Sequence, residues 1–364
     1  MSRKRAVVSG GGSGGHIMPA LAIGRAALDS GLVDEVLFVG AASGLEKDIV
    51  PTYGFAIETL PVGRVRGMGM LTRATGLAGF AASVPAAIRI LRRFDPQFVI
   101  GTGGFASAPT VLAGAALRKR VAVLEQNTIP GATTRVLSRV ADVVCVAFPM
   151  SSGYLPSHKV VVTGNPVRPE IVAARERREK AGPPRPFTVV VLGGSQGALF
   201  LNVRVSKVLG DFAKAHPEVR IVHQAGAGRG EEVGRAYEGT PNVQVVGFVH
   251  DMAALLEGAS VVVGRAGATT IAELTAIGVP AVLIPFPQAV DKHQDHNALA
   301  LQQAGGGRAL FQEGFSDEEL RSVLEEMASV PEVLGRMERR SRAFGRPDAA
   351  RAVLAAVRGE RCSD

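Results

Sequence analysis

The chain has 364 residues, a length that favours two domains, and its content of 46% hydrophobic and 20% charged residues excludes extensive disorder. Lysine and arginine number 41 against 33 for aspartate and glutamate. The net charge of +8 suits an anionic partner, such as a phosphorylated ligand, a nucleic acid or a membrane, or simply a soluble basic surface.

The first half alternates short β-branched runs with longer segments rich in alanine and leucine. Continuous apolar runs separated by helical segments predict a parallel sheet covered on both faces. We expect strands at residues 6–8, 36–39, 98–100, 121–124 and 143–146, and helices at residues 18–30, 71–93 and 109–118. Cys145 lies in the last of these strands, so we predict a buried structural thiol. With only Cys362 besides, the chain indicates neither a disulfide framework nor a zinc site and fits a reducing cytosol.

Residues 97–117 carry no charge and are about long enough to cross a bilayer. Glycines between residues 101 and 104, followed by Pro109, divide this stretch into a strand, a turn and a helix. A bare turn is not tolerated in lipid, so we predict no membrane span here. The basic amino terminus is followed by too short an apolar run to predict a signal peptide.

The alternation restarts in the second half, with strands expected at residues 188–192, 219–222, 243–246, 260–263 and 281–284. A charged, proline-rich stretch at residues 168–186 separates the halves and predicts an interdomain linker. We therefore predict the α/β class, with two doubly wound, Rossmann-like lobes at residues 1–166 and 167–344. A carboxyl-terminal helix at about 345–364 is expected to join the first lobe, and a ligand-binding cleft to lie between the lobes.

The clearest motif is the first glycine turn, at residues 10–15, which fits the pattern G-x-G-x-x-G and follows a predicted strand. A dinucleotide site of this kind needs an acidic residue at the end of the second strand to bind a ribose hydroxyl. Residues 40–43, which follow that strand, include no acid. Binding of NAD is therefore only a minor alternative.

A second glycine turn, at residues 193–197, precedes a predicted helix that runs to residue 213. Such turns present free N–H groups and the positive end of a helix dipole to an anion. Two of them suit a diphosphate and a polar acceptor, whereas the alternative is that both are only tight connections between strand and helix. His16 follows the first turn, where it is placed to act as a general base at neutral pH or as a purely structural histidine.

Two later segments carry polar groups suited to a sugar nucleotide. Residues 264–274 again run from strand through glycine turn to helix, so the backbone near residues 268–270 is placed to cradle phosphates. Glu273 is placed to bind ribose hydroxyls, or else only to stabilise the start of the helix. Residues 291–297 are rich in hydrogen-bonding side chains, but their two histidines are three apart and lack supporting ligands, so a zinc site is a weak prediction.

Seven short motifs in this order and spacing resemble those of the bacterial glycosyltransferases that add N-acetylglucosamine to undecaprenyl-diphospho-muramoylpentapeptide, turning lipid I into lipid II for peptidoglycan. Each motif alone is weak, but together they are highly specific and span nearly the whole chain. The motifs lie at residues 13–16, 101–105, 125–127, 164–168, 193–197 and 268–273, and at His293, Gln294 and Asn297.

This resemblance implies a two-lobed fold of the GT-B type, inversion at the anomeric carbon, and no essential metal or other cofactor. The implied donor is UDP-N-acetylglucosamine, held mainly by the second lobe, and the implied acceptor is lipid I. The implied diphosphate contacts are Ser195, Arg168 and the backbone of Ala268, Thr269 and Thr270. The other implied donor contacts are Val249 for uracil, Glu273 for ribose, Gln294 for the sugar, and Ile271 and Ala272 in the same segment. The implied first-lobe contacts are Ser13, Gly14, Gly15 and Asn127, with His16 as the base on the acceptor's 4-hydroxyl.

The chain departs from this family at two motif positions. Ser13 stands where threonine is common, which keeps the hydroxyl group. Leu124 stands where histidine often precedes the Glu-Gln-Asn run, so no chemistry is assigned to position 124.

A membrane-lipid acceptor implies peripheral attachment to the cytoplasmic face of the inner membrane. Between residues 64 and 93, basic residues bracket apolar ones, a pattern that suits anionic lipid. We expect a membrane-binding loop formed by Arg64, Arg66, Met68, Met70 and Leu71. The helix that follows is expected to bury a stripe of apolar residues in the core, at Leu77, Phe80, Val84 and Leu91.

Three alternative functions remain at this point. One is another two-lobed sugar-nucleotide enzyme, such as a diglyceride glycosyltransferase or a UDP-N-acetylglucosamine epimerase. Another is a non-catalytic, UDP-sugar-binding membrane module. A nucleic-acid binder is disfavoured, because the basic residues lack interleaved aromatics and no recognition motif is present.

Overall fold

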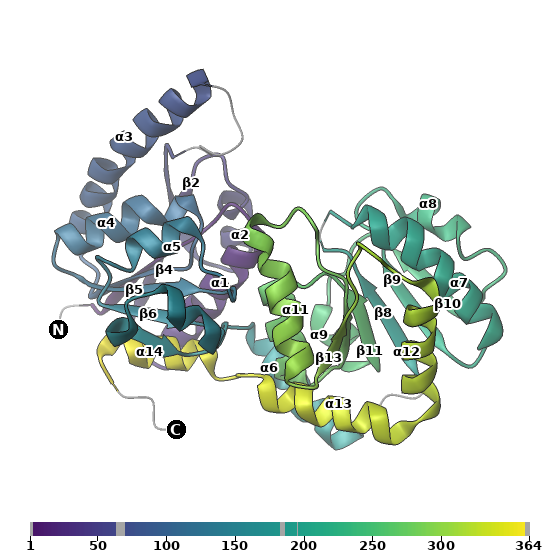
Figure 1. Ribbon diagram of the computed structural model, residues 1–364. Coiled ribbons are helices and arrows are strands. Elements are labelled where there is room, and N and C mark those ends of the chain that lie inside the picture. The colour runs from purple at the N-terminus through teal and green to yellow at the C-terminus, as the bar shows by residue number, and fades with distance from the viewer. Residues whose placement is uncertain (1–2, 63–69, 183–185, 195, 361–364) are drawn as a thin grey trace. The chain divides into compact units, whose positions relative to one another are not determined.

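The computed structural model describes residues 3–62, 70–182, 186–194 and 196–360, with the side chains of residues 70–78 also outside the description (Figure 1). The chain divides into two compact units. The first unit comprises Met1–Arg168 with Arg346–Asp364, and the second unit comprises Pro169–Gly345. The boundaries expected from the sequence lie after residue 166 and at about residue 345.

The first unit contains a seven-stranded parallel sheet in the order β3-β2-β1-β4-β5-β6-β7. Its strands are β1 (Arg5–Ser9), β2 (Glu35–Ala41), β3 (Ala56–Leu60), β4 (Phe98–Gly101), β5 (Arg120–Glu125), β6 (Val143–Val146) and β7 (Val160–Val162). The five predicted strands are all present. The sequence did not predict β3 and β7, which are edge strands and are more exposed than the central ones.

Alternate residues of these strands pack against helices on opposite faces of the sheet. Val8 faces a layer formed by α1 (Gly14–Asp29), α2 (Glu46–Thr52) and α14 (Ala349–Arg358). Its neighbour Val7 faces a layer formed by α3 (Met70–Phe94), α4 (Ala108–Ala116) and α5 (Ala132–Leu137). Each strand is therefore buried on both sides, which explains its continuous apolar sequence.

Several smaller predictions about this unit are confirmed. Residues 97–117 fold as β4, a turn and α4, and none of the helices in the described residues is long and apolar enough to cross a membrane. Cys145 is fully buried. The predicted core helix is α3, in which Leu91 is buried, Phe80 packs against the same core and Val84 is partly buried. The side chain of Leu77 lies outside the described residues.

The carboxyl-terminal helix α14 completes the core of the first unit. Val353, Leu354 and Val357 are buried against the face that α1 also covers. The side chain of Arg120 on β5 donates a hydrogen bond of 3.0 Å to the carbonyl oxygen of Val357. The chain thus returns to the first unit after completing the second.

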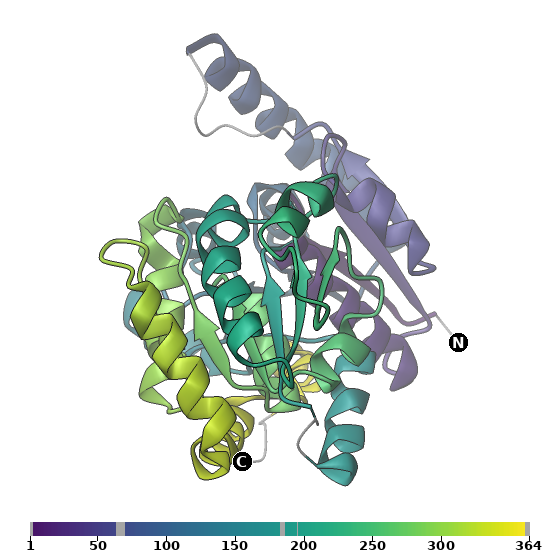
Figure 2. The same cartoon turned by 90° about the vertical axis from the view of Figure 1, so that its right-hand side faces the viewer.

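The second unit contains a six-stranded parallel sheet in the order β10-β9-β8-β11-β12-β13. Its strands are β8 (Thr188–Leu192), β9 (Arg220–Gln224), β10 (Val243–Val246), β11 (Val261–Gly264), β12 (Ala281–Leu283) and β13 (Gly307–Ala309). One face packs on α7 (Ser206–Ala215), α12 (Asp317–Ser329) and α13 (Pro331–Phe344), and Figure 2 views this unit from the side of α7. A turn of π-helix (Leu201–Val205) leads into α7.

The prediction of a linker at residues 168–186 is wrong for most of that stretch. Pro169–Ala181 form α6, which packs on α9 (Met252–Glu257) and α10 (Ala268–Ile277) in the second unit. One of its charged residues, Arg178, is buried. Its side chain donates hydrogen bonds to the carbonyl oxygens of Glu257 and Ala259 and forms an ion pair with Glu338. Because these partners lie far away in sequence, composition alone indicated a solvated connection.

The connections of each sheet reverse direction between two neighbouring strands. These strands are β1 and β4 in the first unit, where Ser9 pairs with Gly101, and β8 and β11 in the second, where Leu192 pairs with Gly264. Ligands of doubly wound sheets bind beyond the carboxyl ends of the strands at such a point. All the glycine-rich turns predicted to carry function begin there.

Candidate functional site

His16 lies in the first turn of α1, directly after the first glycine turn (residues 10–15), and is partly buried. Its Nδ1 lies 3.0 Å from the carbonyl oxygen of Thr102. A carbonyl oxygen can only accept a hydrogen bond, so Nδ1 carries the proton in the neutral ring. The lone pair is therefore on Nε2, which is the nitrogen left for proton abstraction.

The turn after β4 fits closely around this ring because it consists of glycines. Gly103 and Gly104 have φ values of 94° and 75°, which side-chain-bearing residues rarely adopt. A Cβ on Gly103 would lie 2.8 Å from Nδ1 of His16, and one on Gly104 would lie 2.5 Å from the carbonyl oxygen of Gly11. The Thr102 hydroxyl also donates 2.9 Å to the carbonyl oxygen of His16, so two hydrogen bonds join the turns.

A third segment, after β5, completes this cluster. Gln126 donates through Nε2 to the same carbonyl oxygen of Thr102. The buried carboxylate of Glu125 accepts hydrogen bonds from the backbone of Asn127 at 3.0 Å and of Gly131 at 3.1 Å. Three motifs that are distant in sequence are therefore brought together around His16.

The electrostatics of the cluster keep His16 neutral near pH 7. Burial lowers the pKa of His16 below its ordinary value of 6.5. The carboxylate of Glu125 is the strongest opposing influence, followed by hydrogen bonds with Thr102 and Gln126 and by the carboxylate of Glu46. A neutral imidazole with a defined tautomer is the form that a general base requires.

Glu46 is a residue of this region that the sequence analysis missed. It lies at the start of α2, is 1% exposed, and accepts hydrogen bonds from the backbone N–H groups of Gly12 at 3.0 Å and Ala41 at 2.7 Å. Its carboxylate comes three residues after the segment 40–43 that directly follows the predicted strand. Its side chain turns inward to the first glycine turn instead of outward to a ribose.

The other predicted residues of the first unit lie at or near the same edge of the sheet. Ser13, Gly14 and Gly15 are exposed at the start of α1. Asn127 is partly buried, and its carbonyl oxygen accepts a hydrogen bond of 2.8 Å from Ser151. Leu124, to which the sequence assigned no chemistry, is fully buried in the apolar core.

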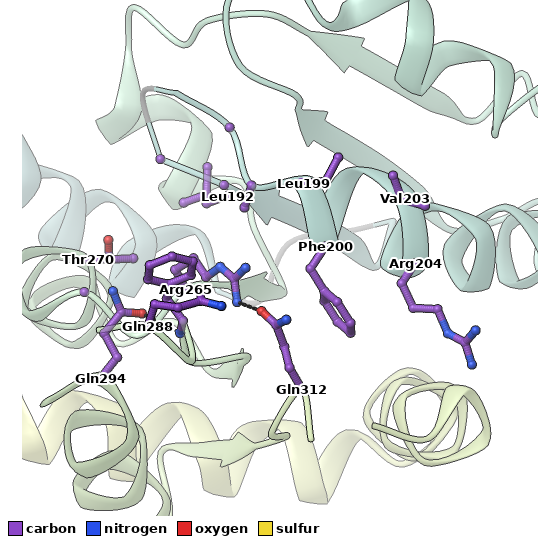
Figure 3. Close-up of a pocket in the computed structure, with 16 residues that line it drawn as sticks. Leu192, Leu199, Phe200, Val203, Arg204, Arg265, Thr270, Gln288, Gln294 and Gln312 are labelled. Atoms are coloured by element: carbon purple, nitrogen blue, oxygen red, sulfur yellow. Dashed lines mark hydrogen bonds between the residues drawn. The ribbon is translucent and has the colours of Figure 1, made fainter. Parts of the chain in front are cut away.

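The second unit holds a cavity of about 810 Å³ at the point where β8 and β11 end. The second glycine turn (residues 193–197), whose Ser195 lies outside the described residues, borders it together with Gly267, Thr270 and Gln294. Figure 3 shows Thr270 and Gln294 at one end of the cavity and Phe200 and Arg204 at the other. The cavity thus joins three of the predicted donor-binding segments.

The amino-terminal end of α10 lies at this cavity. Helix α10 begins at Ala268 after Gly267, so the amides of Ala268, Thr269 and Thr270 belong to its first turn, and Thr270 lines the cavity together with Gly267. Gly197 packs so closely that a Cβ would lie 2.1 Å from the carbonyl oxygen of Ala225. This arrangement is a common binding site for phosphate.

Arg265 is a second functional candidate that the sequence analysis missed. Its Nη1 donates to the carbonyl oxygens of Ile284 and Pro285, both at 3.0 Å, and to Gln312. Figure 3 shows the hydrogen bond to Gln312 beside the cavity. Burial lowers the pKa of Arg265 to about 10, which still leaves a fixed positive charge at pH 7. In the sequence, only its position next to Gly264 in the third glycine turn could have indicated that Arg265 places a positive charge at this cavity.

Gln294 is positioned at the start of α11 (His293–Gln303). Its Oε1 accepts a hydrogen bond of 3.0 Å from the backbone N–H of Phe286, so its amide nitrogen can donate to a ligand. His293 donates through Nδ1 to the carbonyl oxygen of Val290 at 2.6 Å. The parts of the chain that the structure describes contain no group of three or more histidine, cysteine, aspartate or glutamate side chains suited to a metal ion.

The remaining predicted donor contacts do not line this cavity. Glu273 is buried on α10 about one turn beyond Thr270, on the same helix as Ile271 and Ala272. Val249 is partly exposed in the loop after β10. Arg168 is the last residue of the first unit before the chain enters α6.

A buried hydrogen-bond chain supports the second glycine turn from behind. Tyr237 donates 2.8 Å to Nδ1 of His223, whose Nε2 donates 3.2 Å to Oδ1 of Asn202. Asn202 in turn donates 2.7 Å to the carbonyl oxygen of Ala225, against which Gly197 packs. Burial lowers the pKa of His223 to about 4, so the histidine stays neutral and the direction of this chain is fixed.

Comparison with known proteins identifies similar chains along almost the full length. The N-terminal and C-terminal domains of glycosyltransferase family 28 match residues 6–146 and 188–353. A Geobacter sulfurreducens protein is 38% identical over 352 residues, which cover 96% of each chain. It is named UDP-N-acetylglucosamine–N-acetylmuramyl-(pentapeptide) pyrophosphoryl-undecaprenol N-acetylglucosamine transferase. A protein of the same name from Desulforudis audaxviator is 37% identical over 362 residues, again covering 96% of each chain.

Solved structures resemble the whole chain as well. The crystal structure of Acinetobacter baumannii MurG has a TM-score of 0.78 at 30% identity and covers 98% of this chain and 99% of its own. The UDP-GlcNAc 2-epimerase from Neisseria meningitidis, bound to UDP-GlcNAc, has a TM-score of 0.70 at 12% identity, covering 98% and 100%. The second likeness concerns the fold alone.

Proposed function

Because this chain belongs to glycosyltransferase family 28, we propose that it transfers N-acetylglucosamine from UDP-N-acetylglucosamine to lipid I, undecaprenyl-diphospho-N-acetylmuramyl-pentapeptide. The products are UDP and the disaccharide-bearing lipid II. The fold is of the GT-B type, with one glycine-turn site in each unit. An epimerase or a diglyceride transferase is not favoured, since the relatives at more than a third identity are named for this transfer.

One observation carries the mechanism: the Thr102 carbonyl oxygen holds the proton of His16 on Nδ1. Nε2 then removes the proton of the acceptor's 4-hydroxyl while that oxygen forms a bond to C1 of N-acetylglucosamine. The bond between C1 and the diphosphate oxygen breaks on the opposite face, so the anomeric configuration inverts. The carboxylates of Glu125 and Glu46 favour the imidazolium that results, which returns its proton to solvent.

The second unit is proposed to hold the donor and to stabilise the negative charge that develops on UDP. The first-turn amides of α10 at Ala268, Thr269 and Thr270 point at the diphosphate, with Ser195 and Arg168 as further contacts. Arg265 adds a fixed positive charge at the cavity. Preorganised donors of this kind contribute strongly to catalysis, and we propose that they act without an essential metal.

The rest of the donor is assigned to neighbouring residues. Glu273 is proposed to accept hydrogen bonds from the ribose hydroxyls, and Val249 to meet uracil through its backbone. Gln294, whose Oε1 is already occupied by Phe286, is proposed to donate to a sugar hydroxyl. Ser13, Gly14, Gly15 and Asn127 are proposed to contact the acceptor side of the reaction.

Peripheral attachment to the cytoplasmic face of the membrane is also proposed. Arg64, Arg66 and Met68 lie outside the described residues, and Met70 and Leu71 begin α3 with side chains that are not described. The start of α3 extends beyond the sheet of the first unit (Figures 1 and 2). On the same face of that sheet, α5 and its continuation expose two basic and two apolar side chains, namely Arg135, Val136, Arg139 and Val140. This combination suits anionic lipid.

The test uses the full chain, UDP-N-acetylglucosamine and a lipid I analogue in detergent. We expect UDP release only when the acceptor is present, and a product heavier than the acceptor by one N-acetylhexosamine residue in mass spectrometry. Acceptor-independent hydrolysis, epimerised UDP-sugar, or equal transfer to diacylglycerol would each contradict the proposal. Donor binding without turnover on any acceptor would favour a binding module instead.

A further inference from the structure

The buried carboxylate of Glu46 acts on the base only through its charge in the reaction described above, yet it is hydrogen-bonded into the turn that carries the base. Both of its oxygens are used, one by the N–H of Gly12 at 3.0 Å and the other by the N–H of Ala41 at 2.7 Å. The first amide belongs to the first glycine turn and the second to the end of β2. Glu46 therefore ties the turn between β1 and α1 to the neighbouring strand.

Three glycines surround this carboxylate and leave space only for it. A Cβ on Gly11 or Gly44 would lie 2.0 or 2.2 Å from one of the carboxylate oxygens of Glu46. A Cβ on Gly40 would lie 2.4 Å from its Cγ. The sequence thus provides glycine at three positions around the group, one in the first glycine turn and two at or just after the end of β2.

We propose that Glu46 is a positioning residue: its carboxylate closes the first glycine turn from the inside and thereby fixes His16 where Nε2 meets the acceptor hydroxyl. This inference rests on the proposed transferase function and on His16 as its base. The carboxylate of Glu46 occupies the position at the N–H group of Gly12 where a bound anion would otherwise accept a hydrogen bond. The turn is consequently formed before any substrate binds.

The chemistry of the surroundings supports this role. A buried carboxylate is costly unless its oxygens are hydrogen-bonded, and here backbone amides supply the donors. The same charge acts on the base, since Glu46 from α2 and Glu125 from β5 both raise the pKa of His16 against the effect of burial. A group kept for packing alone would not need to be an acid.

The test compares Glu46→Gln with Asp48→Asn in the full chain. Asp48 is an exposed acid in the same first turn of α2, so it controls for a change of charge there. In Glu46→Gln, the new side-chain amide would point an N–H group at one of the two backbone N–H groups. We expect kcat to fall about 10- to 100-fold, because small displacements of a catalytic group have effects of this size. KM and Kd for UDP-N-acetylglucosamine should stay unchanged, since the second unit binds the donor.

Two measurements distinguish positioning from a general loss of folding. Hydrogen exchange followed by mass spectrometry should show faster exchange in peptides covering residues 10–16 and 35–44. The exchange rates of all other peptides should not change. Gly44→Ala provides a second variant, because its Cβ displaces the carboxylate without removing the charge. It should lower kcat in the same way with donor affinity intact.

Several outcomes would overturn the proposal. These are a folded Glu46→Gln enzyme with the kcat of the parent chain, an equal effect of Asp48→Asn, or a fall in donor affinity that matches the fall in rate. The proposed function fails separately, and visibly, if the unaltered chain does not transfer the sugar to the lipid I analogue. Parent activity with an unaffected Glu46 variant would contradict only this inference.

Discussion

The two glycine turns have the same local design, a strand, glycines and a helix, but different groups lie behind them. The first turn is closed by the carboxylate of Glu46, and the cluster around His16 contains a second buried carboxylate, Glu125. The second turn is closed by backbone, with Gly197 packed on the carbonyl oxygen of Ala225, and it borders a cavity that contains Arg265. One turn is therefore backed by negative charge and the other faces positive charge.

This difference shows how one structural motif serves two chemical tasks. Negative charge near the first turn favours a protonated imidazole after proton transfer. Positive charge near the second turn favours a diphosphate, including the additional charge that it gains as the sugar leaves. The glycines provide close approach in both cases, and the side chains behind them determine which ligand is bound.

The largest expected effect concerns the base of the first turn. His16→Ala should reduce kcat by about 10²- to 10⁴-fold, since a positioned general base contributes that much, while Kd for UDP-N-acetylglucosamine stays constant. The rate is measured by UDP release and the affinity by calorimetry. His158→Ala, at an exposed histidine of the same unit, is the control. A variant of His16 that loses donor affinity instead would remove the distinction between the two turns.

The next effect concerns stability in the second unit. Burial lowers the pKa of His223 from 6.5 to about 4, so below pH 6.5 the unfolded chain binds a proton that the folded chain excludes. The free energy of unfolding should fall by about 3 kcal/mol between pH 6.5 and 4 from this group, with no such loss above pH 6.5. Denaturant titrations across this range measure the slope. His223→Gln should flatten the slope and His158→Gln should not, and parallel slopes for all three proteins would refute the assignment.

A tenfold effect is expected at the second turn itself. Gly197→Ala places a Cβ 2.1 Å from the Ala225 carbonyl oxygen at a φ of 70°, so the turn has to move. We expect Kd for UDP-N-acetylglucosamine to rise about tenfold or more, equivalent to about 1.4 kcal/mol. Gly234→Ala in α8 (Gly230–Arg235), where a Cβ meets nothing within 4 Å, is the matched control and should bind the donor normally. Unchanged binding by Gly197→Ala would mean that this turn does not hold the diphosphate.

The smallest effect is a displacement of the pH profile. Because His16 acts as a base and burial lowers its pKa, kcat/KM should decline on the acid side with an apparent pKa below 6.5. Activity is lost as the pH falls through that value, because the imidazole becomes protonated. Rates measured from pH 5 to 8 locate the limb, and residual activity of His16→Gln should lack it. An acid limb with an apparent pKa above 7 would show that the nearby carboxylates raise the pKa of His16 by more than burial lowers it.

Strands could be predicted from the sequence where both faces of the strand are buried, because such strands consist of apolar residues. Central strands such as β1 and β8 are buried on both faces and read as unbroken β-branched runs, whereas β3 and β7 at the sheet edge do not. The charged helix α6 escaped prediction, because Arg178 is satisfied by partners about 80 and 160 residues away.

The site was predictable where its functional residues lie next to one another in the chain. The motif around His16 and the start of α10 could be assigned from local order alone. Glu46 could not, because an acid in the first turn of a helix ordinarily stabilises that helix and only the folded chain shows where its side chain points. The same holds for Arg265 and His223, whose roles depend on carbonyl and side-chain partners from other segments of the chain.

The return of α14 to the first unit has a consequence for synthesis on the ribosome. The apolar face of α1 is made early, but Val353 and Val357, which help cover it, are among the last residues of the described chain to be made. All of Pro169–Gly345 is translated before them. We therefore expect the second unit to finish folding first, in reverse of the order of translation, and the nascent first unit to depend on chaperones until α14 leaves the exit tunnel.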